Sequence, residues 1–227
     1  LRMIRQALKD CGRLQTGEEP KGEVLADALE RIHDQINFLQ TRGLKLWLNA
    51  ILSITPVLGT SLYTLGPGGS LLTVKPMRVL EGWRVRSTGE RSPLNLLSWN
   101  EYYRLGNLTT SGVTNSFFVD KQATNLLVRL WPVPDAATVA GTIELLVQGQ
   151  ALAPTELDET VSFPVEWFMA LRWLLADELS SGQPAVIMDR CAGKAAFYRQ
   201  ALEDWDVEDA PTKFQPDMLS YSQWSRF

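Results

Sequence analysis

Three closely spaced carboxylates, Glu156, Asp158 and Glu159, are the side chains of this sequence best suited to acid–base chemistry. Two carboxyl groups hydrolyse a glycosidic bond when they are held about 5 to 9.5 Å apart, one as acid and the other as base or nucleophile. Spacing along a chain does not define that distance, and such clusters usually supply charges to solvated loops or helix starts. We therefore expect no catalytic residues here, and we keep a peptidoglycan-degrading tail protein as an alternative function.

The chain holds a single histidine, His33, beside the apolar stripe of a predicted helix and next to Asp34. A zinc site or a catalytic triad needs more ligands or partners than this. Cys11 and Cys191 show no metal-ligand spacing, and each falls on an apolar helical position. We expect two buried thiols without a disulfide, because two cysteines in a chain of this size make no disulfide framework. The sequence thus predicts no metal, no cofactor and no enzyme.

Two further motifs resemble binding sites only in part. The run Gly66–Gly69 lacks the Lys-Ser/Thr and the helix that follow the glycines of a phosphate loop, so we interpret it as a turn. Arg84, Arg86 and Arg91 lie close to Trp83, an arrangement that nucleic-acid-binding surfaces use. Three arginines on one strand and loop are also common on any protein surface, and we expect no nucleic-acid site there.

The chain has eight tryptophans, more than a modest core needs. Tryptophan is enriched at protein interfaces, so we expect some of them to contact partners. A monomeric β-rich binding module with an exposed platform around Trp83 or Trp99 is therefore a second alternative function. The eight are Trp47, Trp83, Trp99, Trp131, Trp167, Trp173, Trp205 and Trp224.

The totals describe an ordinary globular chain with a mild negative charge. Its 227 residues are 45% hydrophobic and 21% charged, and 22 basic and 26 acidic side chains give a net charge of −4. Binding DNA through counterion release needs an excess of basic side chains, so we expect no tight binding of DNA. No apolar run approaches the roughly 18 residues of a membrane span, and the first residues lack the apolar region of a signal peptide. We expect a soluble protein of a reducing compartment.

Helical periodicity appears at both ends of the chain. Residues 2–41 carry two apolar stripes of helical spacing, separated by a polar loop. Residues 164–206 hold a helix that is apolar on most sides, followed by a helix with a heptad seam. We expect these N- and C-terminal pairs to pack as a four-helix bundle. The seam consists of Met188, Cys191, Ala195, Tyr198, Leu202 and Trp205.

The middle of the chain is predicted to be an antiparallel β-rich insertion. Alternating leucines at Leu44–Leu48 indicate a strand, and the clearest hairpin joins Leu126–Trp131 to Val139–Gln148 through a connection rich in turn-forming residues. A helical turn is predicted at Asn100–Leu105. Further strands are predicted at Tyr63–Leu65, Met77–Arg86, Pro93–Trp99 and Asn115–Asp120.

The predicted fold is therefore α+β, with residues 1–43 and 160–206 forming the helical bundle and residues 44–159 the β-rich domain. Residues 207–227 form an extended C-terminal arm without periodicity. Disordered tails usually lack aromatic residues, so aromatic anchors in an extended segment suggest docking onto a partner. The alternative is a segment that folds back on its own domain. The predicted partner-binding residues are Phe214, Tyr221, Trp224 and Phe227.

The order of motifs resembles that of the head-to-tail adaptor proteins of short-tailed bacteriophages, which are also called tail accessory or packaged-DNA stabilisation proteins. The resemblance runs in the same order over roughly residues 2–205. The segments that carry it are Ile4–Leu8, Thr16–Pro20, Ala26–Leu29, Thr41–Leu44, Ser61–Gly69, Pro76–Val79, Leu130–Asp135, Leu157–Val161 and Phe163–Pro164.

This resemblance implies a structural virion protein at the junction of capsid and tail, present in the host cytoplasm during assembly. It implies a ring of identical subunits, dodecameric in known members, that docks under the portal protein and contacts the tail nozzle or tail fibres. Such a ring extends the DNA channel, helps to retain the genome and lets it pass during ejection. A mildly negative lumen lets double-stranded DNA slide without specific binding, because it repels phosphates.

Overall fold

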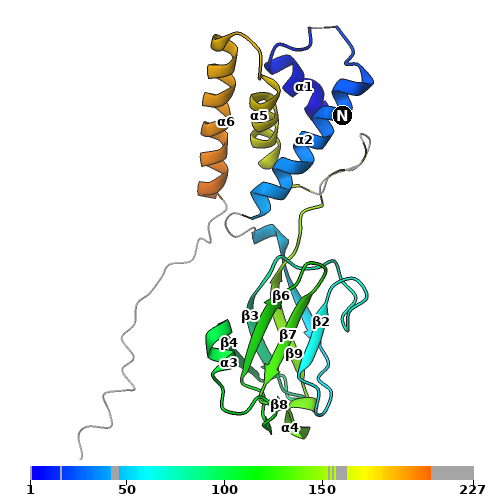
Figure 1. Ribbon diagram of the computed structural model, residues 1–227, viewed down its shortest axis with the longest axis vertical. Coiled ribbons are helices and arrows are strands. Elements are labelled where there is room, and N and C mark those ends of the chain that lie inside the picture. Colours follow the sequence, from blue (N-terminus) through cyan, green and yellow to red (C-terminus); the bar gives the residue numbers. More distant parts are fainter. Residues whose placement is uncertain are drawn as a thin grey trace, which may run out of the picture.

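The computed structural model describes residues 2–15, 17–41, 46–152, 154, 156 and 163–205, and it shows a helical part above a β-rich part (Figure 1). The helical part consists of α1 (Arg2–Asp10), α2 (Gly22–Gln40), α5 (Trp167–Leu179) and α6 (Ala185–Trp205). These helices come from the two ends of the chain, and the middle of the chain builds the sheet. The predicted α+β class is confirmed. Among the described helices, none has the length and hydropathy to cross a membrane.

Helix α5 is the centre of the helical core. It packs against α1, α2 and α6, which explains why its sequence is apolar on most sides. Its residues Leu171, Leu175 and Leu179 are at most 1% exposed. Helix α6 packs mainly on α5, and α1 and α2 touch each other little. The four helices therefore share one core around α5, and the regular four-helix bundle expected from the periodicity is not confirmed.

The heptad seam of α6 faces α5 in its middle and reaches solvent at its ends. Cys191, Ala195 and Leu202 are buried, whereas Met188 and Trp205 are 40% and 53% exposed. The ring of Tyr198 stacks on Trp173 of α5 with their centroids 6.5 Å apart. The seam therefore serves packing within the chain over its central turns.

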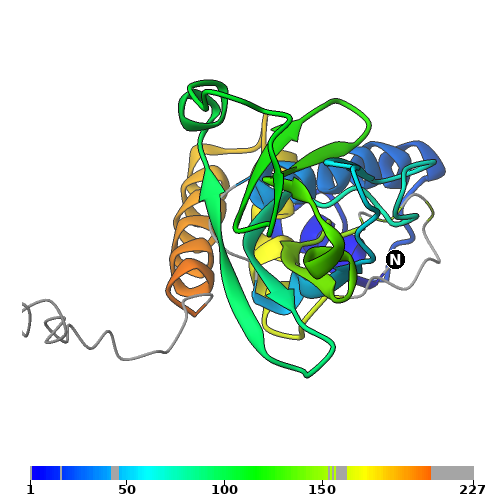
Figure 2. The ribbon, with the colours of Figure 1, turned by 90° about the horizontal axis from the view of Figure 1, so that it is seen from below.

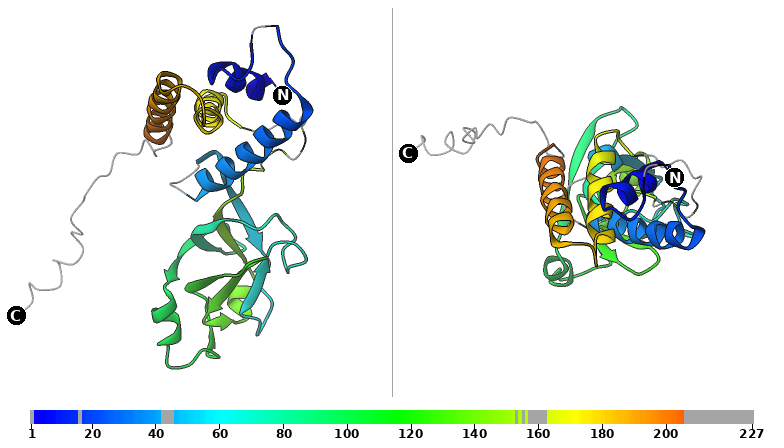
Figure 3. Two further views of the ribbon diagram at one scale, coloured as in Figure 1. Left: turned by 45° about the horizontal axis from the view of Figure 1, so that its top comes forward. Right: turned by 90° about the horizontal axis from the view of Figure 1, so that it is seen from above.

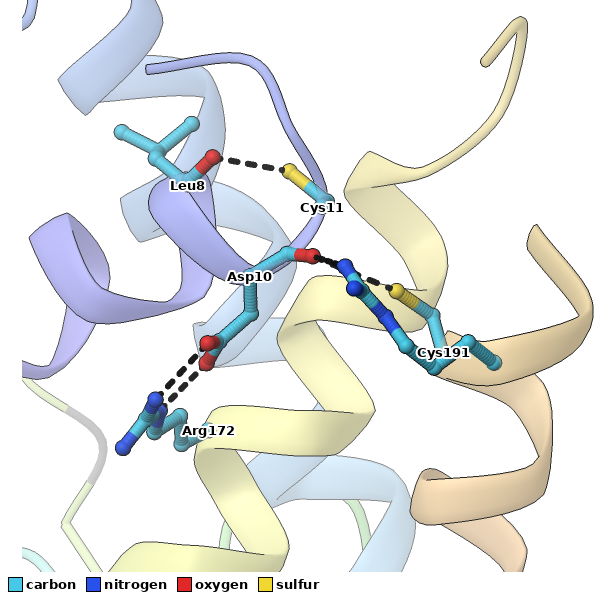
Figure 4. A network of polar contacts seen from close by, with 6 residues as sticks. Leu8, Asp10, Cys11, Arg172 and Cys191 are labelled. Atoms are coloured by element: carbon cyan, nitrogen blue, oxygen red, sulfur yellow. Dashed lines mark hydrogen bonds and ion pairs between the residues drawn. The ribbon is translucent and has the colours of Figure 1, made fainter. Parts of the chain in front are cut away.

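A polar network fastens the end of α1 to α5 and α6 (Figure 4). Arg172 donates to both carboxylate oxygens of Asp10, from Nε to Oδ2 at 2.5 Å and from Nη2 to Oδ1 at 2.8 Å. The main-chain carbonyl of Asp10 accepts a hydrogen bond from Arg190, and the Cys191 thiol lies 3.9 Å from the same oxygen. Cys11 and Cys191 are buried free thiols, as predicted, and burial raises the pKa of both.

Seven strands form one curled sheet in the order β1-β9-β3-β4-β6-β7-β2. A second, two-stranded sheet pairs β5 with β8. Two short helices, α3 and α4, lie between strands, and the short helix η1 precedes β1. The seven strands are β1 (Asn49–Ile54), β2 (Leu62–Leu65), β3 (Arg78–Val85), β4 (Arg91–Leu97), β6 (Ser116–Lys121), β7 (Leu126–Trp131) and β9 (Thr142–Gln148). The remaining elements are η1 (Leu46–Leu48), α3 (Trp99–Tyr103), β5 (Ser111–Gly112), β8 (Val133–Pro134) and α4 (Ala136–Val139).

The curled sheet encloses a core of its own. Alternate residues of β7 and β9 point into it, as the period-two pattern predicts. Phe117 of β6 is fully buried beside Gly82 of β3, where an added Cβ would lie only 2.9 Å from a carbon of the Phe117 ring. Glycine at this position therefore makes room for the largest fully buried side chain.

The predicted hairpin between Leu126–Trp131 and Val139–Gln148 is wrong. Strand β7 pairs with β6 and β2, and β9 pairs with β1 and β3. The connection forms β8 and α4 instead of a tight turn, and Asp135 caps α4 by accepting a hydrogen bond from the Thr138 amide at 2.9 Å. This bond lowers the pKa of Asp135. Because the connection contains this capped turn, the chain crosses from one half of the curled sheet to the other.

Two further strand predictions need correction. Leu46–Leu48 forms the short helix η1 and not a strand, while Leu44 lies outside the described residues. The reason is packing, because Trp47 turns toward the helical core and its ring lies 5.4 Å from that of Phe163. The sheet is also not wholly antiparallel, since β4 and β6 run parallel.

The segment that leads into the sheet and the segment that leaves it lie side by side at the C-terminal end of α2. The side-chain amide of Gln40 donates to the Ala151 carbonyl and accepts from the Ala151 amide, both at 2.9 Å. The Gly149 amide donates to the Leu48 carbonyl at 2.8 Å. These bonds join the two parts of the molecule at one point.

Candidate partner interface

Helix α3 carries an aromatic cluster on the surface of the β-rich part. Its N-terminus forms a capping box in which the Ser98 amide donates to the Glu101 carboxylate at 2.7 Å and the Glu101 amide donates to Ser98 Oγ at 3.4 Å. The amide of Ser98 lowers the pKa of Glu101. The capping box thereby defines where the helical turn begins and holds Trp99 at its first position.

The aromatic side chains of α3 contact Phe118 of β6. Tyr102 is buried and stacks on Phe118 with ring centroids 4.9 Å apart. The centroid of the Trp99 ring lies 4.5 Å from that of Tyr103 and 5.7 Å from that of Phe118. Trp99 is nevertheless 57% exposed, and Tyr103 is 48% exposed. The cluster is thus held from beneath while its outer rings face solvent, which is how aromatic anchors of interfaces are presented.

A hollow of about 670 Å³ opens beside this cluster. Strand β4 pairs with Gly82–Val85 of β3 through its first four residues and with β6 through its last three, Asn95–Leu97. The hollow lies where β4 passes from one partner strand to the other. The residues lining the hollow are Arg78, Val79, Leu96, Leu97, Ser98, Trp99, Glu101, Phe118, Val119, Asp120 and Lys121. Its lining is therefore partly apolar and includes charged residues of both signs.

The outer side of α6 adds a second apolar surface. Phe197 is 64% exposed and Val186 is 81% exposed. In Figures 1 and 3, α6 and α3 lie on the same side of the molecule, one on each part. Large exposed apolar side chains gathered on one side indicate a surface that other proteins cover.

Among the described residues, those considered for catalysis and metal binding form no metal-binding cluster. The side-chain Nδ2 of Asn37 donates to Nδ1 of His33 at 3.1 Å on the surface of α2. Glu156 is exposed, while Asp158 and Glu159 lie outside the described residues. The predicted absence of an acid–base pair at these three carboxylates therefore stays a prediction.

The arginines near Trp83 are engaged within the chain. Arg86 pairs with Glu90 at 2.6 Å, and Arg91 pairs with Glu144 while its guanidinium lies 5.1 Å from the centre of the Trp83 ring. Arg84 is buried. Ion pairing leaves Arg86 and Arg91 little excess charge for a phosphate backbone.

The glycine-rich run is a turn, as predicted. Gly66 and Gly68 have positive φ angles of 142° and 71°, and the Gly69 amide donates to the Gly66 carbonyl at 3.1 Å. Such φ angles favour glycine, because they bring the Cβ of other residues into conflict with the backbone.

Comparison with known proteins identifies the family. The sequence matches the model of the SU10 adaptor protein family over residues 2–214. The chain belongs to the SU10 adaptor protein family. This membership confirms the head-to-tail adaptor resemblance, and the chain has a structural role as a phage head–tail connector of the virion.

Two other comparisons add little to this assignment. No curated protein sequence matches the chain. The solved structures that match include the neck of an empty GTA particle, at 12% identity and a TM-score of 0.28, covering 82% of this chain and 87% of that one.

Only part of the exposed apolar surface of this SU10 adaptor family member is predictable from its sequence. For the alternative of a monomeric binding module, the sequence suggested a platform around Trp83 or Trp99. Trp99 is exposed and Trp83 is half-buried. The exposed side chains of Tyr103, Leu96 and Phe197 were not predicted. Their signal was weak, because an apolar residue in a helix or strand gives no indication of which side a partner covers. The predicted partner-binding residues Phe214, Tyr221, Trp224 and Phe227 lie outside the described residues.

Proposed function

We propose that this chain forms the ring-shaped adaptor of its phage particle, docking under the portal protein and extending the DNA channel toward the tail nozzle or tail fibres. The observation that carries the proposal is the family match, which spans both helical pairs and the whole sheet. The function therefore rests on the complete architecture and not on one motif.

The surface properties are consistent with a ring that guides DNA. The net charge of −4 disfavours adhesion of a polyanion to the channel wall. The exposed apolar side chains of α3 and α6 offer contact area for neighbouring proteins. A dodecamer matches the symmetry of the known adaptors that the sequence resembles.

We further propose a division of labour between the parts. Residues 1–43 and 160–206 would form the domain that makes ring and portal contacts, and residues 44–159 the domain that faces the tail. Residues 207–227 would form an arm that reaches the portal. In this arm Phe214, Tyr221, Trp224 and Phe227 would be the anchors, since aromatic residues dominate the binding energy of many interfaces.

Native mass of the protein, measured alone and after mixing with the phage's portal rings, tests this proposal. We expect a complex with one adaptor per portal subunit, or nearly so. A chain that ignores the portal at every concentration would contradict the adaptor function.

The exposed Trp99 ring favours one second candidate, a monomeric module that binds protein or carbohydrate through an aromatic platform. Such a module would stay monomeric in the presence of portal rings. Its ligand binding would quench or shift the fluorescence of Trp99, and a Trp99→Phe variant would lose that signal.

A further inference from the structure

The fold brings the two cysteines of the chain to the same place. They are the only cysteines of the sequence, and both are fully buried. Cys11 directly follows the last residue of α1, and Cys191 lies in the second turn of α6. In Figures 1 and 2 α5 lies between α1 and α6, and Figure 4 shows that the C-terminal end of α1 meets α6 at these two residues.

The Cys191 sulfur lies close to the peptide group that precedes Cys11. Its Sγ is 3.9 Å from the main-chain oxygen of Asp10. Standard bond lengths place that oxygen about 2.8 Å from the Cα of Cys11, so the Cys191 sulfur lies at most about 6.7 Å from this Cα. A disulfide brings each sulfur to about 4 Å from its partner's Cα. A shift of about 3 Å or less, with rotation of the Cys11 side chain, therefore joins the two sulfurs.

The two reduced thiols make only weak contacts that a disulfide would replace. The Cys11 thiol donates to the Leu8 carbonyl at 3.3 Å, and the Cys191 thiol lies 3.9 Å from the Asp10 carbonyl. Thiols are weak donors, so the loss of these contacts costs little. The new bond would close a loop that contains α2, the whole sheet and α5. Such a long loop restrains the unfolded chain strongly, which stabilises the folded state.

The buried thiols react when α1 moves away from α6. Burial is the first cause that raises the pKa of both thiols, so the folded chain forms few thiolates, which are the reactive species. The charge of Cys11 also raises the pKa of Cys191, in agreement with their closeness. Helix α1 has only nine residues, and so short a helix depends on its tertiary contacts. Local opening of α1 exposes both sulfurs to a small oxidant.

We propose that Cys11 and Cys191 are a latent disulfide pair, reduced while the chain folds inside the host cell and joined after the virion is released, so that α1 is locked to α6. Disulfides are rare in a reducing cytosol and persist outside cells, including at virion surfaces. A connector of the virion passes from the first environment to the second. The proposal rests on the place of the family in the virion, and it requires neither a ring nor a portal contact.

A small disulfide such as oxidised glutathione supplies the oxidising equivalents. One cysteine thiolate attacks it and forms a mixed disulfide, and one glutathione thiolate leaves. The second cysteine thiolate then attacks the protein sulfur of the mixed disulfide and displaces the other glutathione. Two protein thiols thereby lose two protons and two electrons and become one disulfide, while one oxidised glutathione becomes two glutathione thiols.

Thiol mapping of the full chain tests the link. The native protein is incubated with oxidised glutathione, alkylated and digested. We expect the peptide of Cys11 joined to the peptide of Cys191, with no free thiol and no retained glutathione. Cys11→Ser and Cys191→Ser should each carry one glutathione at most. Chains that keep both thiols, carry two glutathiones or link only to other chains would overturn the proposal.

Thermal melting shows whether the link is a lock. The oxidised chain should melt about 5 °C or more above the reduced chain, because a disulfide that closes a long loop stabilises the folded state, and dithiothreitol should reverse the shift. Cys11→Ser treated in the same way should show no such rise. A linked chain with an unchanged or lower melting temperature would mean that the bond strains the fold, and the lock would be wrong.

The route through opening of α1 predicts which variant reacts faster. Asp10→Asn removes the anion that holds α1 to Arg172, so its two thiols should join about fivefold faster or more. Asp27→Asn breaks a surface pair within α2 and should react at the wild-type rate. Equal rates for the two variants would overturn the route through opening of α1.

Particles show whether the pair joins in its own setting. Infected cells and released virions are each alkylated at once, and the two cysteine peptides are then mapped. We expect free thiols in the cells and the linked peptide in the virions. Virions that keep both thiols free would overturn the proposed role, even if the purified chain forms the link. None of these outcomes affects the proposed adaptor function, which portal binding decides separately.

Discussion

The ion pair between Asp10 and Arg172 should contribute strongly to the stability with which α1 packs on the helical core. Its two hydrogen bonds, at 2.5 and 2.8 Å, join side chains that are only 17% and 23% exposed (Figure 4). The isosteric change Asp10→Asn removes the charge and one acceptor, and it leaves the Arg172 guanidinium partly buried without its anion. Hydrogen bonding to Asp10 raises the pKa of Arg172 in the wild-type protein. A guanidinium is always protonated in proteins, so the cation stays charged in the variant as well.

The expected cost follows from the burial of the pair. Hydrogen bonds to charged groups contribute about 1.5–3 kcal/mol each, and removing one partner of a fully buried pair costs about 3–5 kcal/mol. Because about a fifth of each side chain remains exposed, solvent screens part of this energy. We therefore expect Asp10→Asn to lower the free energy of unfolding of the helical part by about 2 kcal/mol.

Urea unfolding followed by far-ultraviolet circular dichroism measures this cost. A double-mutant cycle with Arg172→Met should give a coupling of about 1 kcal/mol or more, since the two changes remove one interaction. The matched control is Asp27→Asn, which breaks the surface pair of Asp27 and Arg31 at 3.0 Å and should cost less than about 0.5 kcal/mol. An Asp10→Asn variant no less stable than this control, or a coupling near zero, would refute the reasoning.

Three further changes test other parts of the molecule. Gly82→Ala should destabilise the β-rich part by about 1–3 kcal/mol through overpacking against Phe117, while Gly106→Ala, whose Cβ would meet no atom within 4 Å, should be near neutral in the same thermal melts. Burial raises the pKa of Asp177, so the folded state binds its proton more tightly than the unfolded state, and stability falls as pH rises from below the ordinary carboxyl pKa of about 4. Asp177→Asn should remove this pH dependence and be more stable than wild type at neutral pH, and identical unfolding curves across pH would contradict it. Deleting residues 207–227 should leave the melting of both parts unchanged and weaken portal binding, as measured by sedimentation with portal rings, and full-strength binding would argue against the arm.

Local sequence patterns predicted the helices whose apolar stripe spans several turns and the strands whose residues alternate between inward and outward faces. The stripes of α1 and α2 and the burial of Cys191 and Leu202 on α6 followed from helical spacing, because one face of a packed helix must leave water. The inward faces of β7 and β9 followed from alternation in the same way. The ordered motifs between residues 2 and 205 also carried the adaptor resemblance, which the family match confirms.

Tertiary structure alone decided which strands pair and which apolar residues stay exposed. The predicted hairpin of β7 and β9 failed because strand pairing depends on how the whole sheet closes, and the capped turn α4 sends the chain across to another edge. The switch of β4 from β3 to β6 has no local signature, yet it opens the hollow beside Trp99. The exposed side chains there look in sequence like ordinary core residues, since hydrophobicity is a property of a residue and burial is a property of its surroundings.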